Sequence, residues 1–147
     1  MKPVKHLIAS ISIAAAIYHY THSLYASLVC IFFGVFPDSD HIIEYIIHYG
    51  YNSFTLKKCY TACEQTNKQK GDYQFKKIYF LFHSNEAAFL LCALALYTKN
   101  MYLFAAVLGY LMHLILDYIG NPAHPGTYFV IWRAKNKFYT QRVLRRR

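Results

Sequence analysis

Acidic side chains are scarce in this chain of 147 residues: seven Asp and Glu accompany 16 Lys and Arg, and the formal net charge is +9. Five of the seven acids lie within four positions of a histidine, and no Lys or Arg lies inside these motifs. The motifs are Asp38-Ser39-Asp40-His41-Ile42-Ile43-Glu44, His83-Ser84-Asn85-Glu86 and His113-Leu114-Ile115-Leu116-Asp117. Carboxylates next to imidazoles, without a cation nearby in sequence, are a ligand set that divalent metals prefer.

Cysteine is also sparse, with four residues and no evident disulfide framework. Cys30 and Cys92 lie in apolar stretches, which is typical of small core residues. Cys59 and Cys63 are four positions apart, but the second cysteine pair that a structural zinc site usually needs is missing. The cysteines are therefore weaker metal candidates than the histidine–acid motifs.

A small-residue cleavage site is missing after the first apolar stretch, so we interpret that stretch as a retained helix rather than a signal peptide. Hydrophobic residues make up 56% of the chain and aromatic residues 18%, above the globular average. They are concentrated in two blocks, about 7–36 and 78–119. This distribution indicates a membrane protein or a membrane-seated helical bundle, with the lipid bilayer as a partner.

The apolar blocks lack period-two alternation, and their lengths favour helices. We predict an all-α, membrane-associated fold: four short helices in two hairpins, plus a short helix after the first motif. Pro37 and the sequence Gly120-Asn121-Pro122 are the strongest stop signals. The chain is expected to be one domain, 1–147, with a polar Lys-rich insert at 51–77 and a basic tail after Pro125. The predicted helices cover 4–18, 24–36, 41–49, 84–98 and 101–119.

The distribution of cations predicts an orientation. Lys99 is the one Lys or Arg in a turn between paired helices, and the positive-inside rule makes the other side of the bundle cytoplasmic. With two hairpins, the three motifs and His6 all fall at that cytoplasmic end. His19 and His22 fall at the opposite end, so we exclude them from the site.

The helical spacing brings the members of each motif together. His113 and Asp117 are four apart, and His83 and Glu86 three apart, so each pair shares a helix face. We predict one or two divalent ions, zinc first, which would favour phosphoester hydrolysis by activated water. Glu86 is a ligand or the general base, and Asp40 a ligand, a catalytic group or the partner that orients a histidine. The expected metal ligands are His6, Asp38, Asp40, His41, His83, Glu86, His113 and Asp117.

Structural explanations remain open for each motif. Asp38 or Asp40 could cap the following helix, and His83 with Glu86 could be an ordinary pair at a helix start. The whole chain could be a non-catalytic membrane protein with a structural metal. Another alternative is a membrane-anchored protein that binds nucleic acid through the basic tail 142–147, although that tail also fits a cytoplasmic flank.

Taken together, the motifs resemble those of the membrane-bound metal-dependent hydrolases, which include the LexA-regulated inner-membrane proteins of bacteria. A more distant similarity is to the zinc-dependent phospholipase C and single-strand nuclease superfamily. The matching positions are His6-Leu7, Phe36-Pro37-Asp38-Ser39-Asp40-His41, Phe82-His83-Ser84, and Gly109-Tyr110-Leu111-Met112-His113 through Asp117. The resemblance implies a bacterial inner-membrane hydrolase acting on a lipid or nucleotide phosphoester. The middle motif departs from the family, because it lacks one histidine and an arginine.

Overall fold

The computed structural model describes residues 3–68, 75–121 and 123–144, and these form two compact units. Unit 1 comprises Met1–Pro37 and Asn85–Gly120, and unit 2 comprises Asp38–Ser84 and Asn121–Arg147. The described residues are mostly helical and contain no β-strand beyond one isolated bridge between Lys77 and Tyr139. The predicted all-α fold is confirmed. Each unit combines two separate chain segments. That the whole chain, 1–147, is one domain stays a prediction.

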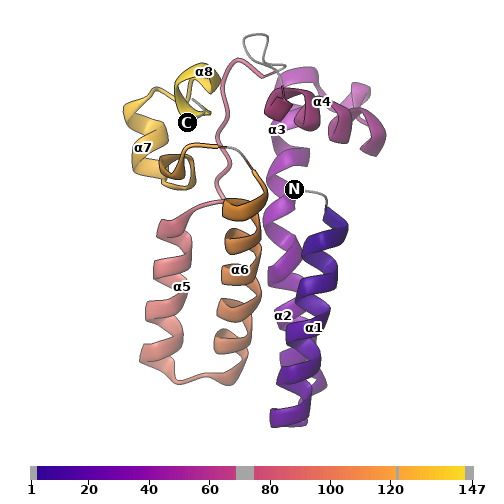
Figure 1. Ribbon diagram of the computed structural model, residues 1–147, viewed down its shortest axis with the longest axis vertical. Helices are drawn as coiled ribbons and strands as arrows, with labels where there is room; N and C mark the ends of the chain where they lie inside the picture. The colour runs from indigo at the N-terminus through magenta and orange to yellow at the C-terminus, as the bar shows by residue number, and fades with distance from the viewer. Residues whose placement is uncertain (1–2, 69–74, 122, 145–147) are drawn as a thin grey trace. The chain divides into compact units, whose positions relative to one another are not determined.

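Unit 1 is a bundle of four long helices in two hairpins (Figure 1). The helices are α1 (Pro3–Thr21), α2 (Leu24–Val35), α5 (Asn85–Thr98) and α6 (Met101–Gly120). Ser23 caps α2, because its hydroxyl accepts the N–H of Ala26 at 3.2 Å. Asn100 has the same role before α6, where its Oδ1 accepts the N–H of Tyr102 at 2.8 Å. Polar caps therefore begin the second helix of each hairpin.

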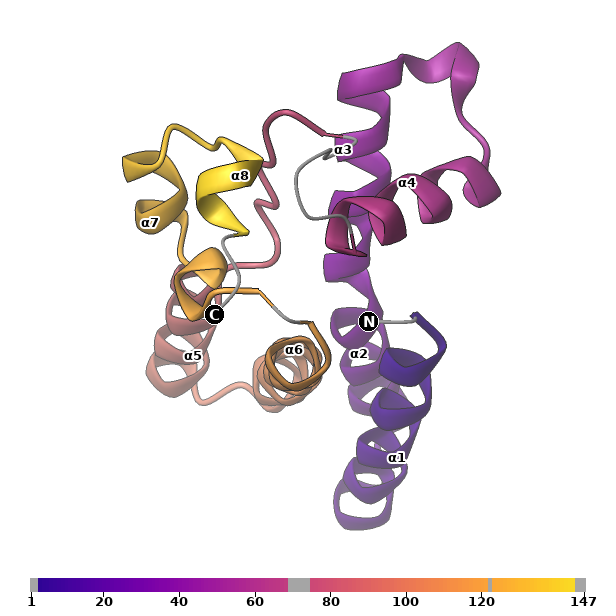
Figure 2. The same cartoon turned by 45° about the horizontal axis from the view of Figure 1, so that its top comes forward.

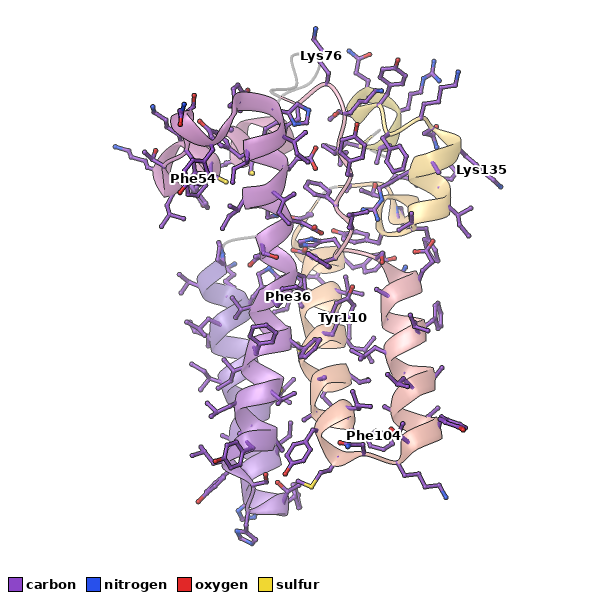
Figure 3. The ribbon with its side chains drawn as sticks, turned by 180° about the vertical axis from the view of Figure 1, so that it is seen from behind. Phe36, Phe54, Lys76, Phe104, Tyr110 and Lys135 are labelled. Carbon is purple, nitrogen blue, oxygen red and sulfur yellow. The ribbon has the colours of Figure 1, made fainter. Side chains whose placement is uncertain are left out.

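Unit 1 buries many small or polar side chains and exposes many large apolar ones. On α2, Leu28 and Phe32 are 52% and 56% exposed, and on α5 Phe89 and Leu90 are 70% and 72% exposed. Side chains stand outward along these helices in Figure 3. Soluble domains have the opposite distribution. The buried small or polar residues of unit 1 include Ser10, Ala14, Ala26, Ser27, Cys30, Gly34, Ala88, Ala95, Ala105, Ala106 and Gly109.

Two glycines let the helices of unit 1 approach closely. A Cβ at Gly34 would overlap the Ser10 hydroxyl, and a Cβ at Gly109 would overlap the Cys30 carbonyl oxygen. Small residues at helix contacts are typical of membrane bundles, where lipid is as apolar as the side chains and close packing drives association. Two helical stretches, Leu24–Tyr49 and Met101–Gly120, are long and apolar enough to cross a membrane.

Unit 2 contains helical segments of three to 13 residues (Figure 2). The helices are η1 (Phe36–Asp38, which enters the unit at its last residue), α3 (Ser39–Tyr49), η2 (Tyr51–Ser53), α4 (Leu56–Lys68), η3 (Pro125–Tyr128), α7 (Val130–Lys135) and α8 (Thr140–Val143). The core consists of Tyr45, Cys59, Ala62, Phe75, Ile78, Val143 and Leu144. The irregular segment 75–84 contributes Phe75 and Ile78 to this core and hydrogen-bonds to the C-terminal region. Ile78 donates its N–H to Phe138 at 3.0 Å, and Thr140 donates its N–H to Lys76 at 3.1 Å.

The five predicted helices correspond to α1, α2, α3, α5 and α6, with ends shifted by a few residues. As expected from Pro37, α2 ends at Val35, although one 3₁₀ turn leads directly into α3. The polar Lys-rich stretch 51–77, which the five predicted helices do not include, contains α4. Its buried face uses the small residues Cys59 and Ala62 among polar neighbours, so its helical period is hard to recognise from sequence.

Candidate metal centre

Three side chains with metal-ligand chemistry gather at the start of α3 in unit 2. Nε2 of His41 and Nε2 of His83 each lie 3.9 Å from Oδ1 of Asp38. The three ligand atoms all lie within 4.8 Å of one another, so this group could hold a metal ion. Ligand atoms on a tetrahedral zinc, with bonds of about 2.0–2.2 Å, lie roughly 3.4 Å apart. The two distances to Asp38 would each shorten by roughly half an ångström on binding one ion.

The buried carboxylate of Asp40 orients His83. Its Oδ2 accepts the N–H groups of Phe82 at 2.6 Å and His83 at 2.9 Å, and the ring Nδ1–H of His83 at 3.1 Å. Because Nδ1 carries the proton that it donates to this carboxylate, the lone pair is on Nε2. Nε2 faces Asp38. Ligating histidines usually donate their second nitrogen in this way. Of the roles predicted for Asp40, the geometry favours the orienting one.

Helix capping does not account for either acid at the start of α3. Asp38 occupies the N-cap position, but its side chain makes no capping hydrogen bond. The Oδ2 atom of Asp40 receives N–H groups from a segment more than 40 residues away in sequence. Both side chains are therefore placed for contacts with the segment that bears His83.

Two further buried charged residues hold that segment. Glu44, which is 1% exposed, accepts the N–H of Tyr79 through Oε2 at 3.1 Å, and its Oε1 lies 3.6 Å from Nδ1 of His48. Arg133 of α7, which is 0% exposed, donates from Nη1 to the His83 carbonyl at 3.3 Å. The backbone around His83 is thus bound by carboxylates of α3 and by a guanidinium from the C-terminal region.

His41 is supported by α4 and by an aromatic ring. The Cys59 thiol donates to the His41 carbonyl at 3.3 Å, and the Phe80 ring meets the imidazole edge-on with centroids 5.0 Å apart. A hydrogen bond from the Cys63 thiol lowers the pKa of Cys59, while that bond and burial raise the pKa of Cys63. Cys59 thus supports the backbone of His41 and packs in the core of unit 2.

Unit 1 contains a second buried cluster of the predicted residues: His6, His113 and Asp117. Nε2 of His6 lies 3.2 Å from Oδ1 of Asp117, and Nε2 of His113 lies 3.6 Å from its Oδ2. The two imidazoles stack with centroids 4.0 Å apart. Nδ1–H of His113 donates to the Gly34 carbonyl at 2.9 Å, which directs Nε2 toward Asp117. An ionised carboxylate at this depth is stabilised by a cation beside it, and a divalent metal could supply that charge.

The predicted site residues thus fall into two groups. Glu86 lies in the first turn of α5 and is partly buried, in unit 1, whereas His83 belongs to unit 2 and pairs with Asp38 and Asp40. That all of the predicted ligands form one centre stays a prediction. Unit 1 holds His6, Glu86, His113 and Asp117, and unit 2 holds Asp38, Asp40, His41 and His83.

Sequence reasoning did not identify Arg133 or assign a role to Glu44. Among the lysines and arginines whose burial the structure describes, Arg133 alone is buried. In the sequence, Arg133 belongs to a basic region that is typical of a cytoplasmic flank. It is 50 positions from His83. Glu44 lies within the first motif, at helical spacing from Asp40. That spacing was the available signal.

Comparison with family models, curated proteins and solved structures finds no match for this chain. The resemblance to membrane-bound hydrolases therefore stays a prediction. The functional argument rests on the residues and their geometry.

Asp40→Asn tests the orienting role of this carboxylate. The amide has nearly the same shape but loses the negative charge that holds the His83 ring and backbone. We expect an affinity for Zn²⁺ about 10–100-fold lower than in wild type, as for other lost partners of metal ligands. Chelator competition measures the affinity, and circular dichroism checks the helical content. Glu64→Gln, which removes an acid of α4 outside the metal group, should bind Zn²⁺ as wild type does. Unchanged affinity in Asp40→Asn would contradict the orienting role.

Proposed function

We propose that this protein is a membrane-associated, metal-dependent hydrolase that acts on a phosphoester. The observation that supports this most directly is the arrangement of His83, with Nδ1 bound to Asp40 and Nε2 beside Asp38 and His41. An imidazole oriented by a carboxylate toward further ligands is typical of metal centres. A structural hydrogen-bond network would not require three ligand atoms to converge within 4.8 Å.

The buried charge around the His83 segment also supports a bound cation. Asp38, Asp40 and Glu44 contribute carboxylates, and Arg133 contributes one guanidinium. Before any imidazole is protonated, these groups leave a net charge of minus two in a largely buried region. Uncompensated buried charge is costly, and a divalent ion would neutralise it.

The proposed chemistry assigns separate roles to the residues. A divalent ion, zinc by first expectation, would supply Lewis acidity toward the ester and lower the pKa of a water molecule. Asp38, His41 and His83 would hold it, and Asp40 would keep the Nε2 lone pair of His83 directed at it. The substrate is a lipid or nucleotide phosphoester, since hard oxygen ligands suit such a centre.

Membrane association is supported by unit 1. Its outward Leu, Ile and Phe side chains would contact lipid, and its small buried residues permit the close helix contacts of membrane bundles. Lys99 is the one Lys or Arg in a turn between the long helices, which favours a cytoplasmic location for the opposite end and for the C-terminus. With the family resemblance, we infer a bacterial inner membrane whose anionic lipids face the basic segments.

Fractionation tests the membrane assignment. The full chain expressed in a bacterium should remain in the membrane pellet after extraction with alkaline carbonate, because lipid-facing side chains hold it there. Recovery of correctly folded protein in the soluble fraction, without detergent, would contradict the assignment.

Hydrolysis tests the catalytic assignment. Zn²⁺-loaded wild type should hydrolyse bis(p-nitrophenyl) phosphate, and Asp38→Asn should reduce kcat/KM at least about 100-fold, since it removes a ligand and its charge. Glu64→Gln should retain wild-type activity. If wild type binds zinc but hydrolyses neither this diester nor a p-nitrophenyl phospholipid analogue above blank, and Asp38→Asn instead lowers the unfolding temperature, the metal is structural and the hydrolase proposal fails.

A further inference from the structure

Arg133 is a charged residue in a place that usually excludes charge. Its side chain is 0% exposed, and arginine is almost never fully buried without a specific reason. The helix that bears it, α7, is only six residues long, and the described neighbours Lys135, Lys137 and Arg142 all keep their side chains exposed. Burial is therefore specific to Arg133 and not a property of the basic region.

The contact that Arg133 makes leads to the candidate centre. Nη1 donates to the His83 carbonyl at 3.3 Å, while the N–H and ring Nδ1 of that same residue donate to Asp40. His83 is thus held by a carboxylate on one side of its backbone and a guanidinium on the other. A lysine lacks the planar guanidinium but would retain the positive charge and an N–H donor for the His83 carbonyl.

The charge of Arg133 also has a consequence for a bound ligand. Asp38, Asp40 and Glu44 place three carboxylates around the His83 segment, so with a divalent ion these groups have a net charge of minus one before Arg133 is counted. A buried guanidinium adjacent to His83 adds a further positive charge in a region of low effective dielectric, where charges interact strongly. The guanidinium brings this total to zero, and its removal would leave a net negative charge that disfavours an oxyanion at the remaining coordination position.

We infer that Arg133 is a positioning residue that fixes His83 and makes the metal centre selective for phosphate-type oxyanions. This inference rests on the proposed function and extends it, because it names the residue that makes an anionic ester the preferred substrate. The side chain of Arg133 is enclosed by the protein. Arg133 therefore acts through its hydrogen bond to His83 and through the electrostatic potential of its positive charge.

Ligand titration of the Co²⁺-loaded full chain in detergent tests this role. Visible absorption reports binding of inorganic phosphate and, at pH 8, of neutral imidazole as the uncharged comparison. Arg133→Gln should weaken phosphate binding at least about tenfold, from the loss of one nearby charge, and change imidazole binding less than about threefold. Arg133→Lys should retain phosphate affinity within about threefold. Arg142→Gln, which removes an exposed arginine of the same unit, should match wild type.

The outcomes separate the inference from the proposed function. If wild type takes up no Co²⁺, the proposed function fails and the inference with it. If Co²⁺ binds but Arg133→Gln leaves phosphate affinity unchanged, or weakens both ligands equally, only the role of Arg133 is overturned. Should Arg133→Gln lose the wild-type helical signal, Arg133→Lys decides: a tenfold loss of phosphate affinity, despite the retained charge, overturns the inference.

Discussion

The contact on which the candidate centre depends is the one between the Asp40 carboxylate and the segment bearing His83. This segment has no regular secondary structure, so its N–H groups need partners outside a helix or sheet. One carboxylate oxygen accepts two of them and the imidazole Nδ1–H as well. Each such N–H left unsatisfied in the interior would cost about 1–3 kcal/mol. The same contact therefore stabilises the segment and sets the ring orientation of His83.

The two units solve different physical problems. Unit 2 has a core of aromatic, aliphatic and cysteine side chains. Its buried carboxylates and guanidinium, among the described residues, contact the segment around His83. Unit 1 exposes many of its large apolar residues and buries many small ones, together with His6, His113 and Asp117. Ionisable groups inside apolar helices are costly and are usually functional. Each unit thus places its histidines and carboxylates where burial has to be compensated by a cation or by hydrogen bonds.

Much of the fold could be predicted because the long helices have clear apolar runs and stop signals. The end of α2, close to Pro37, and the turn between α5 and α6, at Lys99 and Asn100, lie close to the positions predicted from the sequence. The helix α4 escaped prediction because its buried residues are small and its flanks polar. The orienting role of Asp40 depends on a contact across 43 residues, which no local pattern encodes.

The candidate site could be predicted only as a set of residue types. Histidine–acid spacing selected Asp38, His41 and His83 as candidates, and helical spacing places Asp38 near His41. The helix face predicted for His83 and Glu86 is wrong, because α5 begins at Asn85 and His83 lies in the irregular segment 75–84. Arg133 could not be found this way, since its position depends on how the C-terminal helices pack against the segment 75–84. Burial, not sequence, distinguishes it from the other basic residues.

The central claim is that this chain holds a divalent metal through Asp38, His41 and His83. Elemental analysis of protein purified without added metal or chelator, quantified against amino-acid content, tests it most directly. We expect at least about one zinc or other divalent transition ion per chain, retained through gel filtration, for a site of two imidazoles and a carboxylate. A folded, helical preparation with no metal, which also takes up none from Zn²⁺-containing buffer, would contradict it.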